Sequence, residues 1–337
     1  MNKSQACGIE VSAQELVAVW IDSKGKAVLR RFVNTAAGHK QLLHALTRGS
    51  ERVSACMEAT GVYGLDLALF LSAQEQVRVM VANPRAVRHF AQAMMKRSKN
   101  DVIDAGVLCE FVQRMPFVEW KRPSEKALAL WAVSRRLGAL TKQHAAEKNR
   151  LHAASVAISL PAVVRKSVQR MLRLIEREIK ALRQEALALI ADQERIQRRY
   201  RQLRSVTGIG EVSALALLAE LLLLPEDRDV RQWVAFAGLD PRQYSSGTSL
   251  RKHTRISKIG NRHLRHALFM PALVASRRDP HLRGFYQALL ARGVKKKPAV
   301  VAVARKLLHA IYGMFKSDSF YNGAKIFHAP TLSPACF

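Results

Sequence analysis

The sequence predicts an α/β N-terminal domain, then long helices, and then a mainly α-helical C-terminal domain. Residues 7–84 contain short β-type runs separated by segments with helical spacing. Residues 119–200 are rich in Ala, Leu, Arg, Glu and Gln, with apolar residues near heptad spacing. Residues 201–320 contain shorter helical segments joined by Gly-rich turns. With 337 residues, of which 49% are hydrophobic, the chain is long enough for two or three folded domains.

The N-terminal domain, residues 1–118, is expected to contain five strands and three helices. Val, Ile and Trp cluster in its short runs, and "SKGK" forms a turn between two of them. The strands are expected in residues 7–33, which hold three of them, and in residues 52–60 and 76–84, the last ending at Pro84. The helices are expected in residues 36–49, 62–73 and 101–114. This order is typical of a mixed sheet with helices packed on it, as in an RNase H-like domain.

The segment 119–200 is expected to form long helices. Apolar residues recur near heptad spacing at Leu172, Ile175, Ile179, Leu182 and Leu187. This pattern predicts either two antiparallel helices within one chain or a coiled coil with a second subunit. Both alternatives remain open from the sequence.

The C-terminal domain, residues 201–320, contains the stretch "VTGIG". Gly208 and Gly210 permit a tight turn whose amides, with the following helix N-terminus, can hold a phosphate. A helix-hairpin-helix has this pattern, and a purely structural pair of helices is the alternative. Residues 321–337 are mostly turn-forming residues and predict a poorly ordered tail.

The charge of the chain indicates its class of partner. Lys plus Arg number 55 and Asp plus Glu number 26, so the formal net charge is +29. Such an excess indicates nucleic acid. No run of 18 apolar residues or signal-peptide pattern is present, so we expect a cytoplasmic protein without a membrane partner. None of the four cysteines forms a CxxC pair, which argues against a zinc site or a disulfide framework.

Four acidic residues are candidate metal ligands. Asp101 and Asp104 project from one face of an expected helix, directly after the basic residues Lys96, Arg97 and Lys99. By itself this pair also fits a solvated helix start. Glu10 and Glu58 lie in or at the end of expected strands, where a carboxylate is costly unless it is paired or binds a metal. If the four converge, they suit Mg²⁺, which prefers oxygen ligands.

A serine turn is the second candidate site. Ser246 precedes Gly247 within a strongly basic stretch. The surrounding basic residues are Arg242, Arg251, Lys252, Arg255 and Lys258. By chemistry alone, this is an ordinary turn in a phosphate-binding loop.

The motifs "GIEVS", "MEATGVY" and "KRSKNDVIDA" together resemble the DEDD insertion-sequence transposases of the IS110 family, which includes the Piv-type DNA invertases. The resemblance extends to the serine stretch and covers nearly the whole chain. It implies a RuvC-like N-terminal fold and Mg²⁺ bound by Glu10, Glu58, Asp101 and Asp104. It also implies that Ser246 is the covalent nucleophile toward DNA, with the adjacent Ser245 as an alternative.

The resemblance further implies a transposase that cuts and rejoins DNA strands under the guidance of a non-coding bridge RNA. Donor and target DNA would be its substrates, a homodimer or homotetramer its assembly, and the bacterial nucleoid its place in the cell. Glu10 departs from the family, which usually has Asp at this position. Glu is one methylene longer, so its carboxylate is displaced by about 1 Å, and a displacement of that size at a catalytic group can cost about 10²-fold in rate. Two alternatives therefore stay open: a RuvC-like metal-dependent junction nuclease, and a catalytically impaired nucleic-acid-binding copy.

Overall fold

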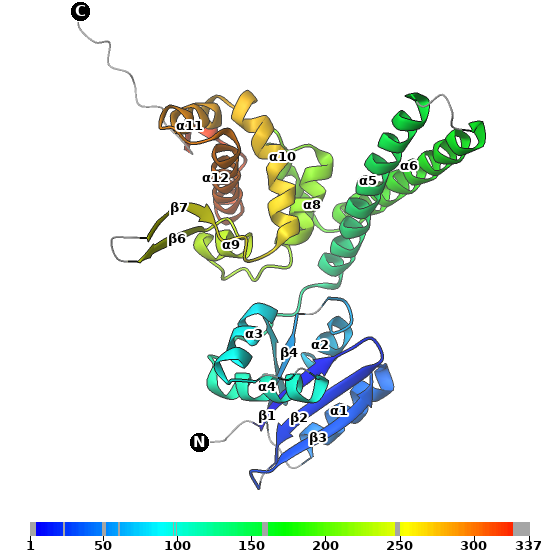
Figure 1. The fold of residues 1–337 in the computed structure, drawn as a ribbon, viewed down its shortest axis with the longest axis vertical. Coiled ribbons are helices and arrows are strands. Elements are labelled where there is room, and N and C mark those ends of the chain that lie inside the picture. The colour runs from blue at the N-terminus through cyan, green and yellow to red at the C-terminus, as the bar shows by residue number, and fades with distance from the viewer. Residues whose placement is uncertain are drawn as a thin grey trace, which may run out of the picture. The chain divides into compact units, whose positions relative to one another are not determined.

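The computed structural model describes residues 5–22, 24–48, 52–59, 61–96, 98, 100–156, 161–246 and 250–325. The chain divides into two compact units, Met1–Arg122 and Pro123–Phe337 (Figure 1). The first is a mixed α/β unit and the second is mostly helical, as the sequence predicts.

The first unit is built on one five-stranded sheet with the order β3-β2-β1-β4-β5. β1, β2 and β3 are antiparallel neighbours, while β4 and β5 continue the sheet in parallel with β1. The strands are β1 (Gln5–Val11), β2 (Glu15–Ile21), β3 (Ala27–Val33), β4 (Val53–Glu58) and β5 (Val77–Ala82).

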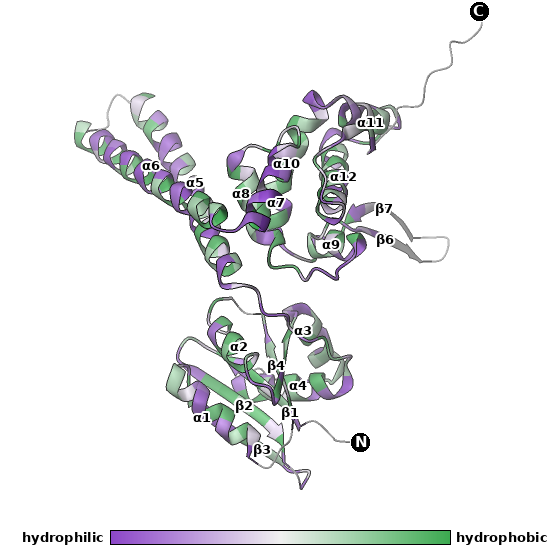
Figure 2. Cartoon of the chain, turned by 180° about the vertical axis from the view of Figure 1, so that it is seen from behind, coloured by the Kyte–Doolittle hydropathy of each residue, from purple (hydrophilic) through white to green (hydrophobic). Residues whose placement is uncertain are grey.

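Helices cover both faces of this sheet. One core joins the strands to α1 (Ala36–Thr47) and α2 (Leu65–Leu71). A second core joins β4 and β5 to α3 (Pro84–Ala93) and α4 (Asp101–Arg114). β2 lies between β3 and β1, and most of its side chains are buried, in keeping with its hydrophobic sequence (Figure 2).

Helix α3 differs from the sequence prediction, which placed only a strand end at Pro84. Asn83 Oδ1 accepts a hydrogen bond from the backbone N–H of Arg85 at 2.9 Å, so Asn83 caps the helix. Pro84 occupies the first helical position, where its fixed φ and missing N–H are tolerated. The Asn-Pro pair therefore starts a helix as well as ending the strand.

The long helices of the second unit form a pair within one chain. α5 (Glu125–Val156) and α6 (Ala162–Ala191) pack side by side. Lys126, near the start of α5, forms an ion pair with Asp192 at the end of α6, so the helices are antiparallel. Farther along the pair, His144 Nε2 lies 2.9 Å from Glu176 Oε1. The intrachain alternative is therefore present, and a coiled coil with a second subunit stays a prediction.

The base of this pair belongs to the core of the remaining helices. Leu130 of α5 and Ile190 of α6 share one buried cluster with Leu203, Leu215 and Leu264. The predicted boundary at residue 200 accordingly falls inside a helix. The other elements are α7 (Glu194–Arg204), α8 (Glu211–Leu221), α9 (Val230–Phe236), β6 (Pro241–Ser246), β7 (Leu250–Ile256), α10 (Arg262–Arg278), α11 (Pro280–Ala291) and α12 (Lys296–Lys316).

The antiparallel hairpin of β6 and β7 was not predicted, since only short helices and turns were expected after residue 200. Polar and basic residues occur on both faces of these strands, as in "PRQYSS" and "LRKHTRI". Their sequences therefore lack the apolar alternation by which strands are recognised.

Residues 321–325, which the sequence assigned to the tail, contact the rest of the second unit. Tyr321 donates a hydrogen bond from its hydroxyl to Asp279 Oδ2 at 2.9 Å, and its backbone N–H donates to Ser205 Oγ at 3.1 Å. A short 3₁₀ helix, η1, follows at Gly323–Lys325. The tail prediction is therefore wrong for 321–325, and 326–337 lie outside the described residues.

Helix α12 is long and apolar enough to span a membrane by length and composition alone. It nevertheless packs against α10 and α11 in the core of the second unit. Its buried residues are Ala299, Val300, Val303, Ala304, Leu307, Leu308, Ile311 and Met314. These contacts are those of a core helix, which explains its composition.

Candidate functional site

Glu10 and Glu58 lie on neighbouring parallel strands at the same level of the sheet. Ile9 of β1 pairs with Met57 of β4, and each glutamate is the next residue. Side chains two residues apart share a face. Glu58 is therefore on the face of Cys56, which packs in the core with α4, and Glu10 is on the face of Gly8, which contacts α4. Both glutamates are half-buried.

Helix α4 brings the two aspartates to this end of the sheet. Cys109 Sγ donates to the carbonyl oxygen of Ala6 at 3.5 Å, and the backbone of Ala105 lies against Gly8. The helix therefore runs opposite to β1, and its first turn extends toward residue 10. That turn contains Asp101 and Asp104.

The start of α4 is fixed by Asn100. Its Oδ1 accepts a hydrogen bond from the backbone N–H of Ile103 at 2.9 Å, as in a normal N-cap. Asp101 is exposed and Asp104 is half-buried. Positive partial charge at the helix N-terminus favours both carboxylates in this turn.

The four acids suit a divalent metal by type and by backbone position. Their carboxylate oxygens are the ligands that Mg²⁺ and Ca²⁺ prefer. Within the described ranges, however, no group of three or more His, Cys, Asp or Glu side chains is arranged to hold an ion. The backbone thus gathers Glu10, Glu58, Asp101 and Asp104 at one end of the sheet, while their side chains do not form a closed ligand set.

Buried thiols lie beside these acids. Burial raises the pKa of Cys56 to about 12, and the charge of Glu58 adds to this effect. Burial also raises the pKa of Cys7 and of Cys109. All three are free and buried, so they are neutral packing residues.

Exposed basic residues lie on α3 and on the connection that leads to α4. Lys96 is exposed, whereas Arg97 and Lys99 lie outside the described residues. Arg85 and Arg88 are exposed on α3, a helix that packs on α4 through an edge-to-face contact between Phe90 and Phe111, with ring centroids 5.2 Å apart. These two arginines were missed because the helix that presents them was not predicted.

Ser246 is the last residue of β6, in the second unit. It pairs with Leu250 across the hairpin, and Ser245 pairs with Arg251. Gly247 lies outside the described residues, as do the side chains of residues 243–253. The predicted phosphate contacts Arg251 and Lys252 are thus placed only by the backbone of β7.

The base of this hairpin is well anchored. Arg242 pairs with Arg255 across the strands, and both are exposed, as is Lys258. The backbone N–H of Ser257 donates to the carbonyl oxygen of Asp240 at 2.8 Å. The hairpin therefore presents predicted phosphate contacts from a fixed base.

A buried acid holds the segment that follows the hairpin. Glu220 of α8 is 3% exposed and accepts a hydrogen bond from Asn261, which caps α10. Arg135 of α5 completes this group, with its Nε 2.8 Å from Glu220 Oε1. The cation and the hydrogen bond make the buried charge of Glu220 tolerable. Because the three residues come from different elements, their contacts connect α5, α8 and the start of α10.

The two glycines of "VTGIG" differ in what they contribute. Gly208 has φ +95°, and a Cβ there would lie 2.7 Å from the carbonyl oxygen of Pro271. Its neighbours Val206 and Ile209 are buried, so this glycine serves packing. Gly210 is exposed and caps α8. Phosphate binding at this turn remains a prediction.

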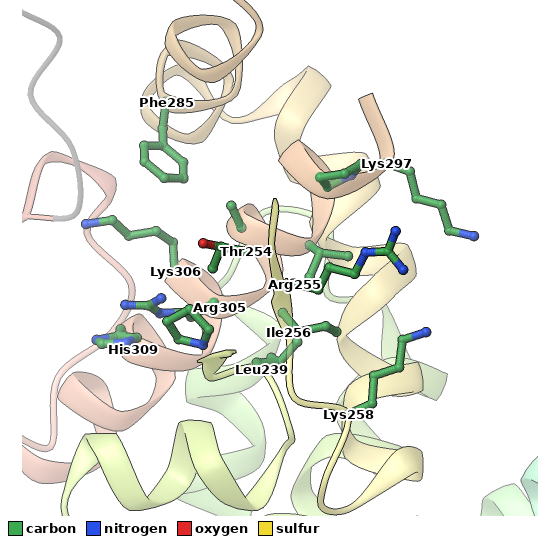
Figure 3. Close-up of a pocket in the computed structure, with 14 residues that line it drawn as sticks. Leu239, Thr254, Arg255, Ile256, Lys258, Phe285, Lys297, Arg305, Lys306 and His309 are labelled. Atoms are coloured by element: carbon green, nitrogen blue, oxygen red, sulfur yellow. The ribbon is translucent and has the colours of Figure 1, made fainter. Parts of the chain in front are cut away.

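A pocket of about 570 Å³ lies between the base of the hairpin and α12 (Figure 3). Its apolar lining includes Leu239, Ile256, Phe285 and Val301. Its basic lining residues are Arg255, Lys258, Lys297, Arg305 and Lys306. The sequence indicated Arg255 and Lys258, but it contained no signal that they share a pocket with residues of α12.

Comparisons with known proteins identify the family of the chain. A family model of the DEDD transposases of IS110 matches residues 7–159, and a model of the IS116/IS110/IS902 family of transposases matches residues 200–287.

The chain belongs to the IS110 family of transposases.

Relatives of this transposase extend over most of its length. The pilin gene-inverting protein of Moraxella bovis is 26% identical over 291 residues, which cover 85% of this chain and 88% of that protein. The transposase for insertion sequence element IS1328 of Yersinia enterocolitica is 31% identical over 235 residues, or 61% of this chain and 66% of that protein. This transposase is accordingly a DNA recombination enzyme.

Proposed function

We propose that the transposase cuts and rejoins DNA strands through a covalent bond between Ser246 and DNA. The observation that carries the proposal is the gathering of Glu10, Glu58, Asp101 and Asp104 at one end of the first unit's sheet. The names of the relatives, a gene-inverting protein and transposases, support strand exchange over simple cleavage. The sheet order supports a RuvC-like fold for this unit.

The proposed reaction has two steps, cleavage and rejoining. The Ser246 oxygen bonds to the scissile phosphorus while the bond from phosphorus to a deoxyribose oxygen breaks; that oxygen leaves as a hydroxyl. A deoxyribose hydroxyl of the second strand then attacks the phosphoserine and restores Ser246. Arg242 and Arg255 pair at the base of this hairpin and Lys258 follows it, so these residues would bind the strand on one side of the scissile phosphate.

The four carboxylates would hold Mg²⁺. Bound there, the ion supplies charge stabilisation at a phosphodiester and favours deprotonation of an attacking oxygen. Glu10 and Glu58 would reach the ion from the sheet, and Asp101 and Asp104 from α4. The basic residues Arg85, Arg88 and Lys96 would bind the DNA backbone next to them.

The proposed partners are donor DNA, target DNA and a non-coding bridge RNA that selects both. The net charge of +29 supports the simultaneous binding of several polyanions. A homodimer or homotetramer, associated with the nucleoid, is the proposed assembly.

Trapping of a protein–DNA adduct tests this proposal. The purified protein is mixed with Mg²⁺, end-labelled donor DNA and RNA transcribed from the non-coding flank of its element, then denatured. Ser246→Ala should abolish the labelled adduct, while the adjacent matched variant Ser245→Ala should retain it.

Two results would count against the proposal. An adduct that survives Ser246→Ala and disappears in Ser245→Ala assigns the nucleophile to Ser245. Cut DNA with free ends and no adduct indicates a junction nuclease that uses water.

A third outcome concerns the activity of this copy. If the wild-type chain neither cuts nor forms an adduct and Glu10→Asp restores both, this copy is impaired at Glu10.

A further inference from the structure

The pocket at the base of the hairpin combines an apolar interior with a cationic edge. β7 contributes Arg255 and Ile256, α11 contributes Phe285, and α12 contributes Arg305 and Lys306. Of the described residues that line it, none is Asp or Glu. Such a pocket suits a ligand with an apolar planar part and attached anionic groups.

The size of the pocket and its aromatic side chain narrow the ligand class. Its volume of about 570 Å³ lies within the range of roughly 300–1,000 Å³ that is usual for small-ligand pockets. Phe285 is half-buried, and Lys306 Nζ lies 5.6 Å from its ring centroid. An aromatic ring beside cations is the combination that proteins use to bind single-stranded nucleic acid, because bases stack and phosphates pair with Lys and Arg.

The pocket continues along α12. A second hollow of about 400 Å³ shares Lys306 and His309 with the first and extends to Phe320 and Asn322. The two hollows are therefore adjacent along α12. Burial, with Arg305 and Lys306 nearby, lowers the pKa of His309, so its ring is neutral at neutral pH and can hydrogen-bond to a base.

We propose that this pocket binds one unpaired nucleotide of a nucleic-acid strand. The base lies against Phe285 and the apolar lining, and the flanking phosphates bind Arg255, Arg305 and Lys306. Single-stranded DNA and single-stranded RNA both carry bases and phosphates, so the proposal covers a nucleotide of either. This binding uses neither the carboxylates of the first unit nor Ser246, so it stands independently of the proposed strand chemistry.

The position of the pocket suggests what the binding achieves. Pro241 and Ile256 pair at the base of the hairpin, whereas Ser246 pairs with Leu250 at its far end. Five residues of β-strand extend about 16 Å. If Ser246 is the nucleophile, a nucleotide held in the pocket sets the distance between an unpaired strand and the reacting phosphate.

Fluorescence anisotropy with metal-free protein tests the proposal. The probes are labelled ten-nucleotide oligothymidylate, oligouridylate, an abasic DNA strand of the same length and a ten-base-pair duplex. Phe285→Leu keeps an apolar side chain and removes the aromatic ring. It should weaken binding of the oligothymidylate or the oligouridylate about tenfold, a loss that lies within the usual range for one base on an aromatic ring. It should leave abasic-strand and duplex affinities unchanged.

Charge variants provide the second measurement. Arg305 is exposed on α12, and Arg283 is an exposed arginine on α11 outside the pocket lining. Arg305→Ala should reduce the slope of log affinity against log salt for the oligonucleotide by about 0.7, the value for one phosphate on a single strand. Arg283→Ala should change the slope less.

Specific outcomes overturn the proposal. Equal losses for base-containing and abasic strands after Phe285→Leu mean that no base enters the pocket. Equal salt slopes for Arg305→Ala and Arg283→Ala mean that its cations bind no phosphate. Comparison of the affinities for oligothymidylate and oligouridylate shows whether the pocket binds DNA or RNA. Strand cleavage can fail in the same protein while this binding persists, so the two proposals are tested separately.

Discussion

Gly8 of β1 lies so close to Ala105 of α4 that a Cβ at Gly8 would be 2.1 Å from the Ala105 carbonyl oxygen. No side chain fits between the strand and the helix at this point. The close approach sets the path of α4 across the sheet and therefore the position of Asp101 and Asp104 relative to Glu10 and Glu58.

Gly8→Ala should destabilise the first unit by about 3 kcal/mol, because backbone atoms of α4 must move to admit the methyl group. Denaturant unfolding measures the effect. The matched control is Gly106→Ala on α4, where a Cβ meets nothing within 4 Å. Since Ala is the better helix former, the control should gain about 0.5–1 kcal/mol. Equal stability of the two variants would contradict the packing of α4 on β1.

Glu10→Gln should lower the affinity for Mg²⁺ by at least about tenfold, because an amide supplies no charge to the ion. Isothermal titration calorimetry measures this directly. Glu15→Gln on β2 is the control, since Glu15 is half-buried like Glu10 but pairs with Arg31. Unchanged metal affinity in Glu10→Gln would remove Glu10 from the set of ligands.

Glu10→Asp should raise strand cleavage, by up to about 10²-fold, because it restores the shorter side chain that the family usually has at this position. Cleavage of labelled donor DNA under single-turnover conditions measures the change. A loss of cleavage instead would show that the backbone around β1 is adapted to the longer glutamate.

Arg135→Ala should destabilise the second unit by about 3 kcal/mol, because it leaves the buried carboxylate of Glu220 without its cation. The corresponding fall in Tm is roughly 6–12 °C, measured by calorimetry. Arg136→Ala, at the next and exposed position, should change stability by less than about 0.5 kcal/mol. Similar Tm values for both variants would show that Asn261 alone stabilises Glu220.

Acid should destabilise the first unit through His39. Burial lowers the pKa of His39 below its ordinary value of 6.5, although Asp66 opposes the shift. The unfolded chain therefore takes up the proton first: stability is fully present above pH 6.5, falls as the pH drops through 6.5, and levels off below the folded pKa. Urea unfolding at pH 7.5 and 5.5 measures this fall. His39→Gln, which does not titrate, should show a smaller one, and an equal fall would exclude His39 as a cause.

The residue types of the candidate site were predictable because carboxylates are unusual in buried strands. Glu10 and Glu58 stand in or at the end of hydrophobic runs, and Asp101 and Asp104 share one helical turn. In contrast, Arg85 and Arg88 were missed along with α3, since Asn83 and Pro84 end a strand and start a helix with the same two residues. The β6–β7 hairpin was missed because neither of its faces is apolar.

The sequence by itself determined the family, the mixed sheet, the long helices and the residues that can carry the chemistry. Only the tertiary structure decided that α5 and α6 pair within one chain and that the base of this pair shares a core with the later helices. It also decided that β7, α11 and α12 form one pocket. The reason is physical: strand register, the path of α4 over Gly8, and pocket shape depend on packing between side chains far apart in the chain, which local patterns do not specify.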